Sequence, residues 1–394
     1  MSRSTRSWWR VAAVVVSLAL VASACGKSKN NNASSDNSNA KAVSLAFVGP
    51  KTGDAANLGI FIRNAAQLAI EQANAAQNKY KFTLKEFDTQ GDPAQAPGQL
   101  AKYKDDQSIL GLVGPTFSGE TKAVLPDLKA AGLVMISASA TNADIPNVPP
   151  GGSDEFHRVL PDDKAQGAGI AKFIKAKYAG KKVYFIDDNQ EYSKGLTDQL
   201  SAALGTPKTS ANSSQINKDD DLYSAAVNAA KAAKPDVVFY GGYYAAAGKL
   251  KKQLTDAGVT ATFISGDGSL DSGFISAAGA GGEGAIISCP CNLATDSAAG
   301  ALGKFAKDYK AKFGSDSGTY SAEGFDAANI LIKGIEAGND TRAKLLAYVE
   351  GVTSYDGISK KIVWETNGNL KATTVYFFQV KNGKFVSLTN TDAL

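Results

Sequence analysis

Small polar residues with no neighbouring cation gather in the stretch GPTFSGETKAV, which runs from Gly114 to Val124. The stretch follows an apolar run, Ile109–Val113, and opens a segment with helical spacing in which the first basic residue is Lys122. The start of a helix presents unpaired N–H groups and the positive end of the helix dipole, so it can bind a carboxylate without a cation. Ser118 is placed to begin this helix and to add its hydroxyl. The stretch therefore predicts a carboxylate-binding site.

Other polar residues likewise stand just after apolar runs that we expect to be strands. They are Thr141 in SASATN after Leu133–Ile136, Tyr192 in DDNQEYSKG after Lys182–Ile186, Tyr243 in GGYY after Asp236–Tyr240, and Asp267 in GDGS after Ala261–Ser265. In open parallel sheets, ligands bind in the crevice beyond the carboxyl ends of the strands. Asp267 offers the negative charge that an ammonium group needs, and the two tyrosines offer flat apolar walls with a polar tip. The set suits a small zwitterion.

Each of these residues also has a purely structural explanation. A serine that opens a helix often serves only as its cap. An aspartate between two glycines, such as Asp267, is often a turn residue, and a tyrosine after a strand often packs in the core. Their recurrence after strand ends in both halves of the chain favours a shared binding site.

The elements that must position these residues alternate between short β-rich runs and helical stretches. The expected strands are Val43–Val48, Phe82–Phe87, Ile109–Val113, Leu133–Ile136, Lys182–Ile186, Asp236–Tyr240, Ala261–Ser265 and Gly284–Ser288. The expected helices are Leu58–Ala76, Gln95–Lys104, Gly119–Ala130, Gln166–Tyr178, Lys194–Leu204, Leu222–Ala233 and Ala245–Ala257. Continuous apolar strands between helices indicate parallel sheets covered on both faces. We predict an α/β fold of two doubly wound parallel-sheet lobes joined by a hinge.

The end of the chain has a different pattern. Three helical stretches, Ala298–Phe313, Ala322–Ala337 and Arg342–Gly351, precede strand-like alternation with turn signals at Asn367-Gly368 and Asn382-Gly383. The pattern itself fits either lobe. We expect the helices to complete lobe 1, as residues 42–160 and 290–357, and the strands to complete lobe 2, as residues 161–289 and 358–394.

The first 24 residues are predicted to be a signal peptide. They contain a basic start, an apolar run too short to span a bilayer comfortably, and the sequence ASAC, at Arg3, Arg6, Arg10, Val11–Val21 and Ala22–Cys25. We expect Cys25 to receive lipid and to anchor the protein on the extracytoplasmic face of the cell membrane. An ordinary secretory signal cut near Ala24 is the alternative. Residues 25–41 are polar and repetitive, which predicts a flexible tether.

Charge and composition exclude several function classes. Without the three arginines of the signal, 39 Lys and Arg remain against 38 Asp and Glu, a net charge of +1, whereas nucleic-acid binding needs a basic face. Outside the reducing cytosol, Cys289 and Cys291 would tend to pair, although a C-x-C ring is strained and redox motifs usually read C-x-x-C. The single histidine, His157, is too few for a zinc site, so we expect no metal, cofactor or catalytic residue.

Several blocks carry a family resemblance. In chain order they are VSLAFVGPKTGDAANLG, ILGLVGPTFSGETKAVLPDLKAAGLVMISASATN, VYFIDDNQEYSKGL, DVVFYGGYYAAAGKLKKQL and TFISGDG. Together they resemble the periplasmic leucine/isoleucine/valine-binding proteins, which are substrate carriers of ABC importers. The resemblance runs from about Val43 to Asn369. It implies a monomer of the periplasmic binding protein type I kind, which closes around a branched-chain or other aliphatic amino acid and delivers it to a permease.

The resemblance also implies a role for each site residue. Ser118 would bind the ligand carboxylate, and Ser139, Ala140 and Thr141 would contact both carboxylate and ammonium. Tyr192 and Tyr243 would close from the second lobe, and Asp267 would take the ammonium group. That acid is commonly Glu in the family, and the shorter Asp267 leaves the ligand open, since relatives also bind amides, urea-like compounds and aromatic acids.

Two other functions remain as alternatives. One is a sensory receptor for an amide or aromatic acid, which would capture its ligand in the same way but signal through a membrane partner. The other is a secreted α/β hydrolase, but the chain lacks the G-x-S-x-G elbow and has only His157 as a histidine base.

Overall fold

The computed structural model describes residues 40–76 and 79–394. The predicted signal peptide, Cys25 and the predicted tether up to residue 39 lie outside the described residues. The first strand begins at Lys41, so this last residue of the predicted tether already belongs to the fold. Within the described ranges, no helix has both the length and the apolar character needed to cross a membrane.

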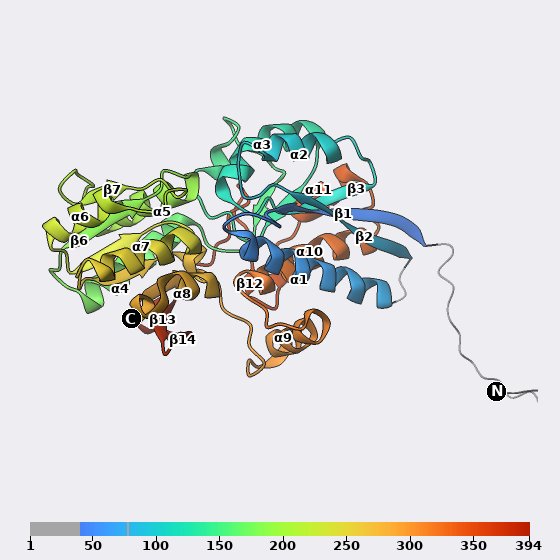
Figure 1. The fold of residues 1–394 in the computed structure, drawn as a ribbon. Coiled ribbons are helices and arrows are strands. Elements are labelled where there is room, and N and C mark those ends of the chain that lie inside the picture. Colours follow the sequence, from blue (N-terminus) through green and yellow to red (C-terminus); the bar gives the residue numbers. More distant parts are fainter. Residues whose placement is uncertain (1–39, 77–78) are drawn as a thin grey trace, which may run out of the picture. The chain divides into compact units, whose positions relative to one another are not determined.

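The first sheet has five strands in the order β2-β1-β3-β4-β5, and every pair in it is parallel. The strands are β1 (Lys41–Gly49), β2 (Tyr80–Asp88), β3 (Ile109–Val113), β4 (Met135–Ser137) and β5 (Phe156–Arg158). Helices α2 (Ala96–Tyr103) and α3 (Ser118–Ala131) lie on one side of this sheet, and α1 (Ala56–Ala75) and α10 (Ser321–Glu336) lie on the other (Figure 1). All five residues of β3 are buried, as expected for a strand covered on both faces.

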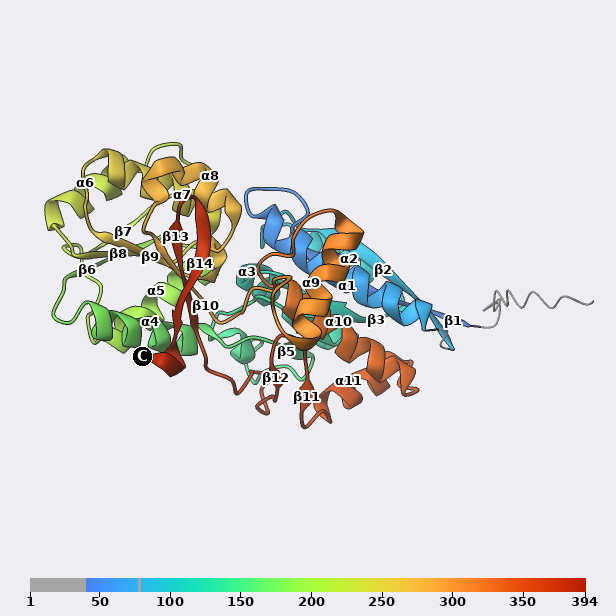
Figure 2. The ribbon, with the colours of Figure 1, turned by 90° about the horizontal axis from the view of Figure 1, so that it is seen from below.

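The second sheet has seven strands in the order β14-β13-β10-β9-β8-β6-β7. The strands are β6 (Val183–Asp187), β7 (Ser213–Gln215), β8 (Val237–Tyr240), β9 (Thr262–Ser265), β10 (Ile286–Cys289), β13 (Tyr376–Lys381) and β14 (Lys384–Asn390). Helices α4 (Asp163–Lys177) and α5 (Glu191–Leu204) cover one face, and α6 (Ser224–Ala233), α7 (Tyr244–Asp256) and α8 (Ser272–Ala278) cover the other (Figure 2). The final strands β13 and β14 pair antiparallel across the predicted Asn382-Gly383 turn, and β13 pairs antiparallel with β10, so the otherwise parallel sheet is mixed at this end.

The last helices pack against the first sheet. They are α9 (Gly300–Phe313), α10 and α11 (Arg342–Glu350), followed by the small hairpin of β11 (Tyr355–Asp356) and β12 (Lys361–Ile362). The guanidinium of Arg342 donates to the carbonyl oxygens of Lys104, Asp106 and Ile109, which ties α11 to the edge of β3. Buried apolar side chains on α1 and α10 form part of one core with those of β1 and β3.

The chain passes between the two sheets after β5, after β10 and after β12 (Figure 2). At the last crossing, the Trp364 indole donates to the carbonyl oxygen of Arg158, and Asn369 Oδ1 accepts from the Arg158 guanidinium. Residues up to Asn369 therefore still contact β5. We infer that the return to lobe 2 lies after Asn369 rather than at the predicted 357/358 boundary.

Short elements were missed by the sequence pattern. They are β5, β7 and α8, of which the two strands have only three residues each. Cys289 and Cys291, at the end of β10, are joined in a disulfide. His157 in β5 is buried and packs edge-on against Trp364 with ring centroids 4.6 Å apart, a structural position.

The two Asn-Gly turns lead to a stability prediction. Gly368 and Gly383 have positive φ values of 78° and 67°, but a Cβ on Gly368 would lie 1.9 Å from the carbonyl oxygen of Phe156, whereas one on Gly383 meets nothing within 4 Å. Gly383→Ala should cost about 1 kcal/mol of unfolding free energy from backbone strain alone. Gly368→Ala should cost a further ~1–3 kcal/mol from the clash with β5. Urea unfolding of both variants measures the difference, and equal losses would refute the close contact at Phe156.

Candidate functional site

The carboxylate site predicted at Ser118 lies at the first turn of α3. Ser118 is the first residue of the helix and is buried, and its Oγ accepts from the backbone amide of Asn142 at 3.1 Å. The Phe117 amide is not available to a ligand, because it donates to Glu120 Oε2 at 2.8 Å. The hydroxyl of Ser118 and the following amides therefore face the loop that follows β4.

The loop after β4 is held by hydrogen bonds within itself, to the loop after β3 and to Arg158 at the end of β5. Ser139 Oγ donates to the carbonyl oxygen of Thr116 at 2.6 Å, and the Ala140 amide donates to Ser137 Oγ at 3.0 Å. Arg158, fully buried, donates through Nη1 to the carbonyl oxygens of Ala140 and Asn142 at 2.9 and 3.0 Å. These contacts fix the position of Thr141, the residue between those two carbonyls.

Asp267 lies beyond the end of β9 and is fully buried. It accepts two short hydrogen bonds of 2.6 Å, from the Tyr192 hydroxyl to Oδ1 and from the Tyr320 hydroxyl to Oδ2. Burial raises the pKa of Asp267, although the two hydroxyls act to lower it. Both of its carboxylate oxygens thus have a donor from the protein.

A second buried acid, Asp163, has no such donors. It is the first residue of α4, it is fully buried, and neither carboxylate oxygen has a hydrogen-bond partner within residues 40–76 and 79–394. Burial raises its pKa well above the ordinary range, the charge of Asp267 raises it further, and Thr141 and Arg158 lower it. An acid in this state needs a positively charged donor to be stable in its ionised form.

Two further acceptors close to Asp163 are also buried and unpartnered within the same ranges. These are Thr141 Oγ1 and Gln166 Oε1. Gln166 also donates through Nε2 to Ser288 Oγ at 3.1 Å, which orients its amide. A primary ammonium group carries three N–H donors and no acceptor. The free atoms of Asp163, Thr141 and Gln166 match such a group.

Aromatic rings form a wall beside these polar groups. Tyr192 and Tyr243 lie with ring centroids 5.0 Å apart, and Tyr243 lies 4.4 Å from the ring of Phe117. Phe117 immediately precedes Ser118 and comes from the first lobe, whereas both tyrosines come from the second. Both lobes therefore contribute rings to this wall.

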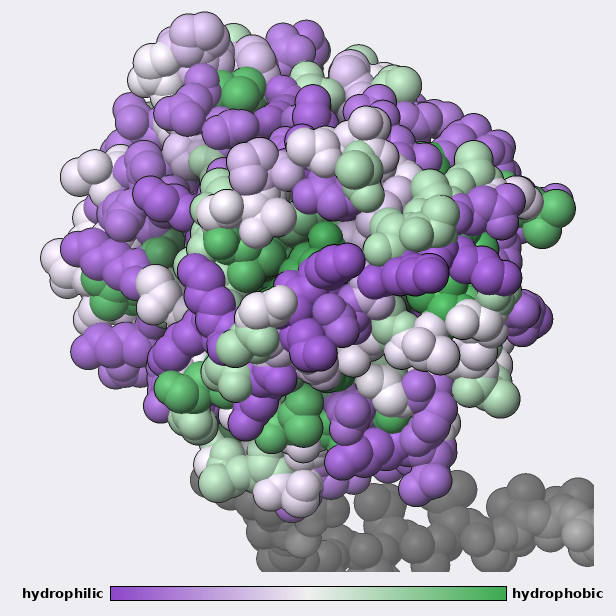
Figure 3. Space-filling view, turned by 90° about the vertical axis from the view of Figure 1, so that its left-hand side faces the viewer, coloured by the Kyte–Doolittle hydropathy of each residue, from purple (hydrophilic) through white to green (hydrophobic). Residues whose placement is uncertain are grey.

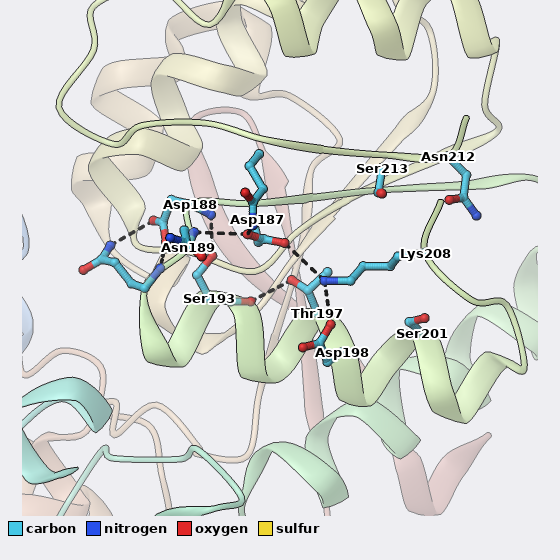
Figure 4. A network of polar contacts seen from close by, with 12 residues as sticks. Asp187, Asp188, Asn189, Ser193, Thr197, Asp198, Ser201, Lys208, Asn212 and Ser213 are labelled. Carbon is cyan, nitrogen blue, oxygen red and sulfur yellow. Dashed lines mark hydrogen bonds and ion pairs between the residues drawn. The ribbon is translucent and has the colours of Figure 1, made fainter. Parts of the chain in front are cut away.

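A polar network holds the start of α5, the helix that carries Tyr192 (Figure 4). Ser193 Oγ accepts from the Asp188 amide at 2.9 Å, and Lys208 pairs with Asp187 and Asp198 at 3.2 and 2.5 Å. The Tyr240 hydroxyl donates to Asp188 Oδ2 at 2.8 Å. Because these bonds join β6, β8 and α5, the position of Tyr192 is set by the sheet.

The structure thus brings Ser118, Thr141, Tyr192, Tyr243 and Asp267 to one place. The bond from Asn142 Nδ2 to the Glu191 carbonyl oxygen, 2.7 Å long, joins the loop of Thr141 to the start of α5. The hydroxyl of Ser139 donates to the loop after β3, and the amide of Ala140 donates to Ser137 at the end of β4. That all seven bind a ligand stays a prediction.

The sequence prediction missed Asp163, Gln166, Phe117 and Tyr320. Asp163 follows β5, and the rule of looking just past each strand would have found it if the three residues of β5 had been predicted as a strand. Tyr320 immediately precedes α10 and has a φ of 67°, a left-handed conformation that no sequence pattern near it indicates.

Comparison with known proteins identifies the family of the chain. The family described as periplasmic binding protein matches residues 42–384. The chain belongs to this family. Among curated relatives of this periplasmic binding protein, the Leu/Ile/Val-binding protein BraC3 of Rhizobium johnstonii is 29% identical over 353 residues, covering 88% of this chain and 93% of the relative.

A second relative is the leucine-, isoleucine-, valine-, threonine- and alanine-binding protein of Pseudomonas aeruginosa, 27% identical over 335 residues, 84% of this chain and 88% of the relative. Among solved structures, the branched-chain amino acid transporter substrate-binding protein LivJ of Streptococcus pneumoniae in complex with isoleucine has a TM-score of 0.80 and 23% identity, and the match covers 89% of this chain and 99% of that chain. This likeness confirms the predicted two-lobed α/β fold.

Glu120, beneath the carboxylate site, leads to a pH prediction. It is fully buried, and burial raises its pKa from 4.5 to about 7, against hydrogen bonds from Thr89 and the Phe117 amide. Because the folded state holds this proton more tightly than the unfolded state, its contribution to stability is full below pH 4.5 and is lost as the pH rises through 7. Glu120→Gln stays neutral, so between pH 4.5 and 8 the wild type should lose up to about 3 kcal/mol relative to the variant.

Urea unfolding of both proteins at several pH values measures this difference. The other buried acids are the same in both chains, so their contributions cancel. Parallel stability curves for the wild type and Glu120→Gln would show that folding does not raise the pKa of Glu120.

Proposed function

We propose that the chain is an extracytoplasmic substrate-binding lipoprotein, anchored through Cys25, that captures a small aliphatic amino acid between its lobes and delivers it to an ABC permease. The observation that carries the proposal is the buried cluster of free acceptors on Asp163, Thr141 and Gln166 opposite the first turn of α3. This pairing of a cation site with an anion site suits the two charges of an amino acid.

In this proposal each group has a distinct role. Ser118 and the first amides of α3 bind the carboxylate, and Asp163, Thr141 and Gln166 accept from the ammonium group. Asp267 fixes the hydroxyls of Tyr192 and Tyr320, each of which donates to one of its oxygens. The printed names of the relatives support the ligand class, because the Rhizobium protein is named for leucine, isoleucine and valine and the Streptococcus protein was solved with isoleucine.

The mechanism is closure of the lobes around the ligand, with no chemical step. Lys122 on α3 pairs with Glu191 on α5 at 2.7 Å, and Asn57 on α1 donates to Asp271 Oδ1 at 3.0 Å. These contacts join the lobes, and a ligand bound by both lobes would add to them and favour the closed form.

The surface suits a protein that works as a monomer. On the face seen in Figure 3, hydrophilic residues predominate and hydrophobic residues show in small groups between them. In the described part of the chain, the large hydrophobic side chains that are exposed are Leu222 and Leu388.

The role of Asp163 can be tested with matched variants. Asp163→Asn should weaken binding of valine or leucine by at least about tenfold, because it removes the charged acceptor of the ammonium group. Asp267→Asn should also weaken binding, through loss of order at Tyr192 and Tyr320. Asp162→Asn is the control, since it changes the same charge on the neighbouring residue and keeps an oxygen that can cap the Ala165 amide. Isothermal titration calorimetry measures all three, and unchanged affinity in Asp163→Asn would remove that residue from the site.

The ligand class itself is tested by a thermal-shift screen of the purified chain against amino acids, aliphatic amides and aromatic acids. A ligand that binds only the folded state raises the melting temperature. We expect shifts with aliphatic amino acids. Shifts with amides or aromatic acids alone would favour the receptor alternative instead.

A further inference from the structure

A pocket of about 450 Å³ opens at the mouth between the two lobes, outside the proposed amino-acid site. Its first-lobe side is made by the loops that follow β1 and β2 and by Phe117. Its second-lobe side is made by the loops after β6 and β7 and by the start of α7. Phe117 and Tyr243 line this pocket. The neighbour of Phe117 in the chain, Ser118, and the ring partner of Tyr243, Tyr192, belong to the inner site.

The two rings stand between the inner site and this outer pocket. Their centroids are 4.4 Å apart, so they are in direct contact across the lobes. Phe117 is only 5% exposed, and a Cβ added to Gly91 would lie 2.9 Å from its Cε2, so the ring is held against the loop after β2. The Phe117 ring therefore has little room to move aside while the lobes are closed.

We infer that the Phe117–Tyr243 pair is the outer wall of the ligand's side-chain space and sets the upper length of the side chains that the protein accepts. The inference rests on the proposed function and adds its specificity rule. Under this rule, short and branched aliphatic side chains end before the ring pair. Long linear side chains would have to pass through the position of the Phe117 ring.

The outer pocket has its own chemical preference. Its lining includes four carboxylates, Asp54, Asp92, Asp188 and Asp219, and two ammonium groups, Lys218 and Lys249. Lys218 pairs with Asp219 at 2.5 Å, so the charges of these two residues offset each other. The remaining groups leave an excess of negative charge, and a cleft lined by one sign of charge favours ligands of the opposite sign. A side chain that reached this pocket would be favoured if it carried a positive charge.

The experiment compares Phe117→Ala with the wild type by calorimetry, using valine, norleucine, lysine and glutamate. We expect the wild type to bind valine and to reject lysine. In Phe117→Ala, the valine-to-lysine affinity ratio should fall by at least about tenfold, because one side-chain contact in an apolar pocket discriminates by that order. Norleucine should gain less than lysine, and glutamate should not gain, because of the carboxylates in the outer pocket.

Two further variants test whether the change in the affinity ratio is specific to the Phe117 ring. Phe117→Leu keeps most of the apolar volume and should fall between the wild type and Phe117→Ala, which also covers the case in which the alanine variant folds poorly. Phe313→Ala removes a ring that packs on Tyr309 in α9 and should leave the ratio unchanged.

The outcomes of these experiments distinguish the length rule from the proposed function on which it rests. A wild-type chain that binds none of the amino acids would refute the proposed function and the length rule with it. A wild-type chain that binds valine, together with Phe117 variants whose valine-to-lysine ratio is unchanged, would refute the length rule alone. If the valine-to-lysine and valine-to-glutamate affinity ratios fell equally in Phe117→Ala, the ring pair would still limit side-chain length. The charge preference of the outer pocket would then be refuted.

Discussion

The buried carboxylate of Asp163 is the constraint on which the arrangement of the site depends. An ionised acid removed from water without hydrogen-bond donors is strongly unfavourable, and such a group either takes up a proton or meets a cation. Asp267 shows the other solution, since two tyrosine hydroxyls satisfy its oxygens. The two buried acids therefore differ in whether hydroxyl groups of the protein donate hydrogen bonds to their oxygens. Each oxygen of Asp267 already accepts from a protein hydroxyl, whereas in the proposed function the ammonium group of the ligand supplies the donor for Asp163.

Arg158 connects this acid to the hinge. It lies at the first crossing between the lobes, and its guanidinium donates to the carbonyl oxygens of Ala140 and Asn142 and to Asn369 at the last crossing. Its charge also lowers the pKa of Asp163, but less than burial raises it. A change in the hinge would thus be felt by the loop that carries Thr141. The hinge and the loop that carries Thr141 are held by the same buried guanidinium of Arg158. Movement of the lobes is therefore coupled to the position of Thr141.

Much of the fold could be predicted from sequence, because long apolar strands and amphipathic helices leave strong periodic signals. The expected Ile109–Val113 strand has the same bounds as β3. The Asn382-Gly383 turn signal likewise lies between β13 and β14, which pair antiparallel. The signal failed where elements are short, at the three residues each of β5 and β7. Missing β5 hid Asp163. The sequence also showed Asp267 as an acid near the site but not that Tyr192 and Tyr320 satisfy both its oxygens, because contacts between distant segments leave no local pattern.

In the proposed function, closure of the lobes itself supplies selectivity. Bringing the lobes together removes Asp163, Thr141 and Gln166 from water, and that cost is the same whichever ligand is present. A ligand with an ammonium group returns hydrogen bonds to all three, whereas one without it leaves them unpaired. The difference between the two ligands is then the cost of unpaired buried acceptors, which is larger than the strength of the added bonds alone. The lobes thus discriminate by what they leave unsatisfied when they close, and the ring wall beside Ser118 adds a limit on length to this requirement for charge.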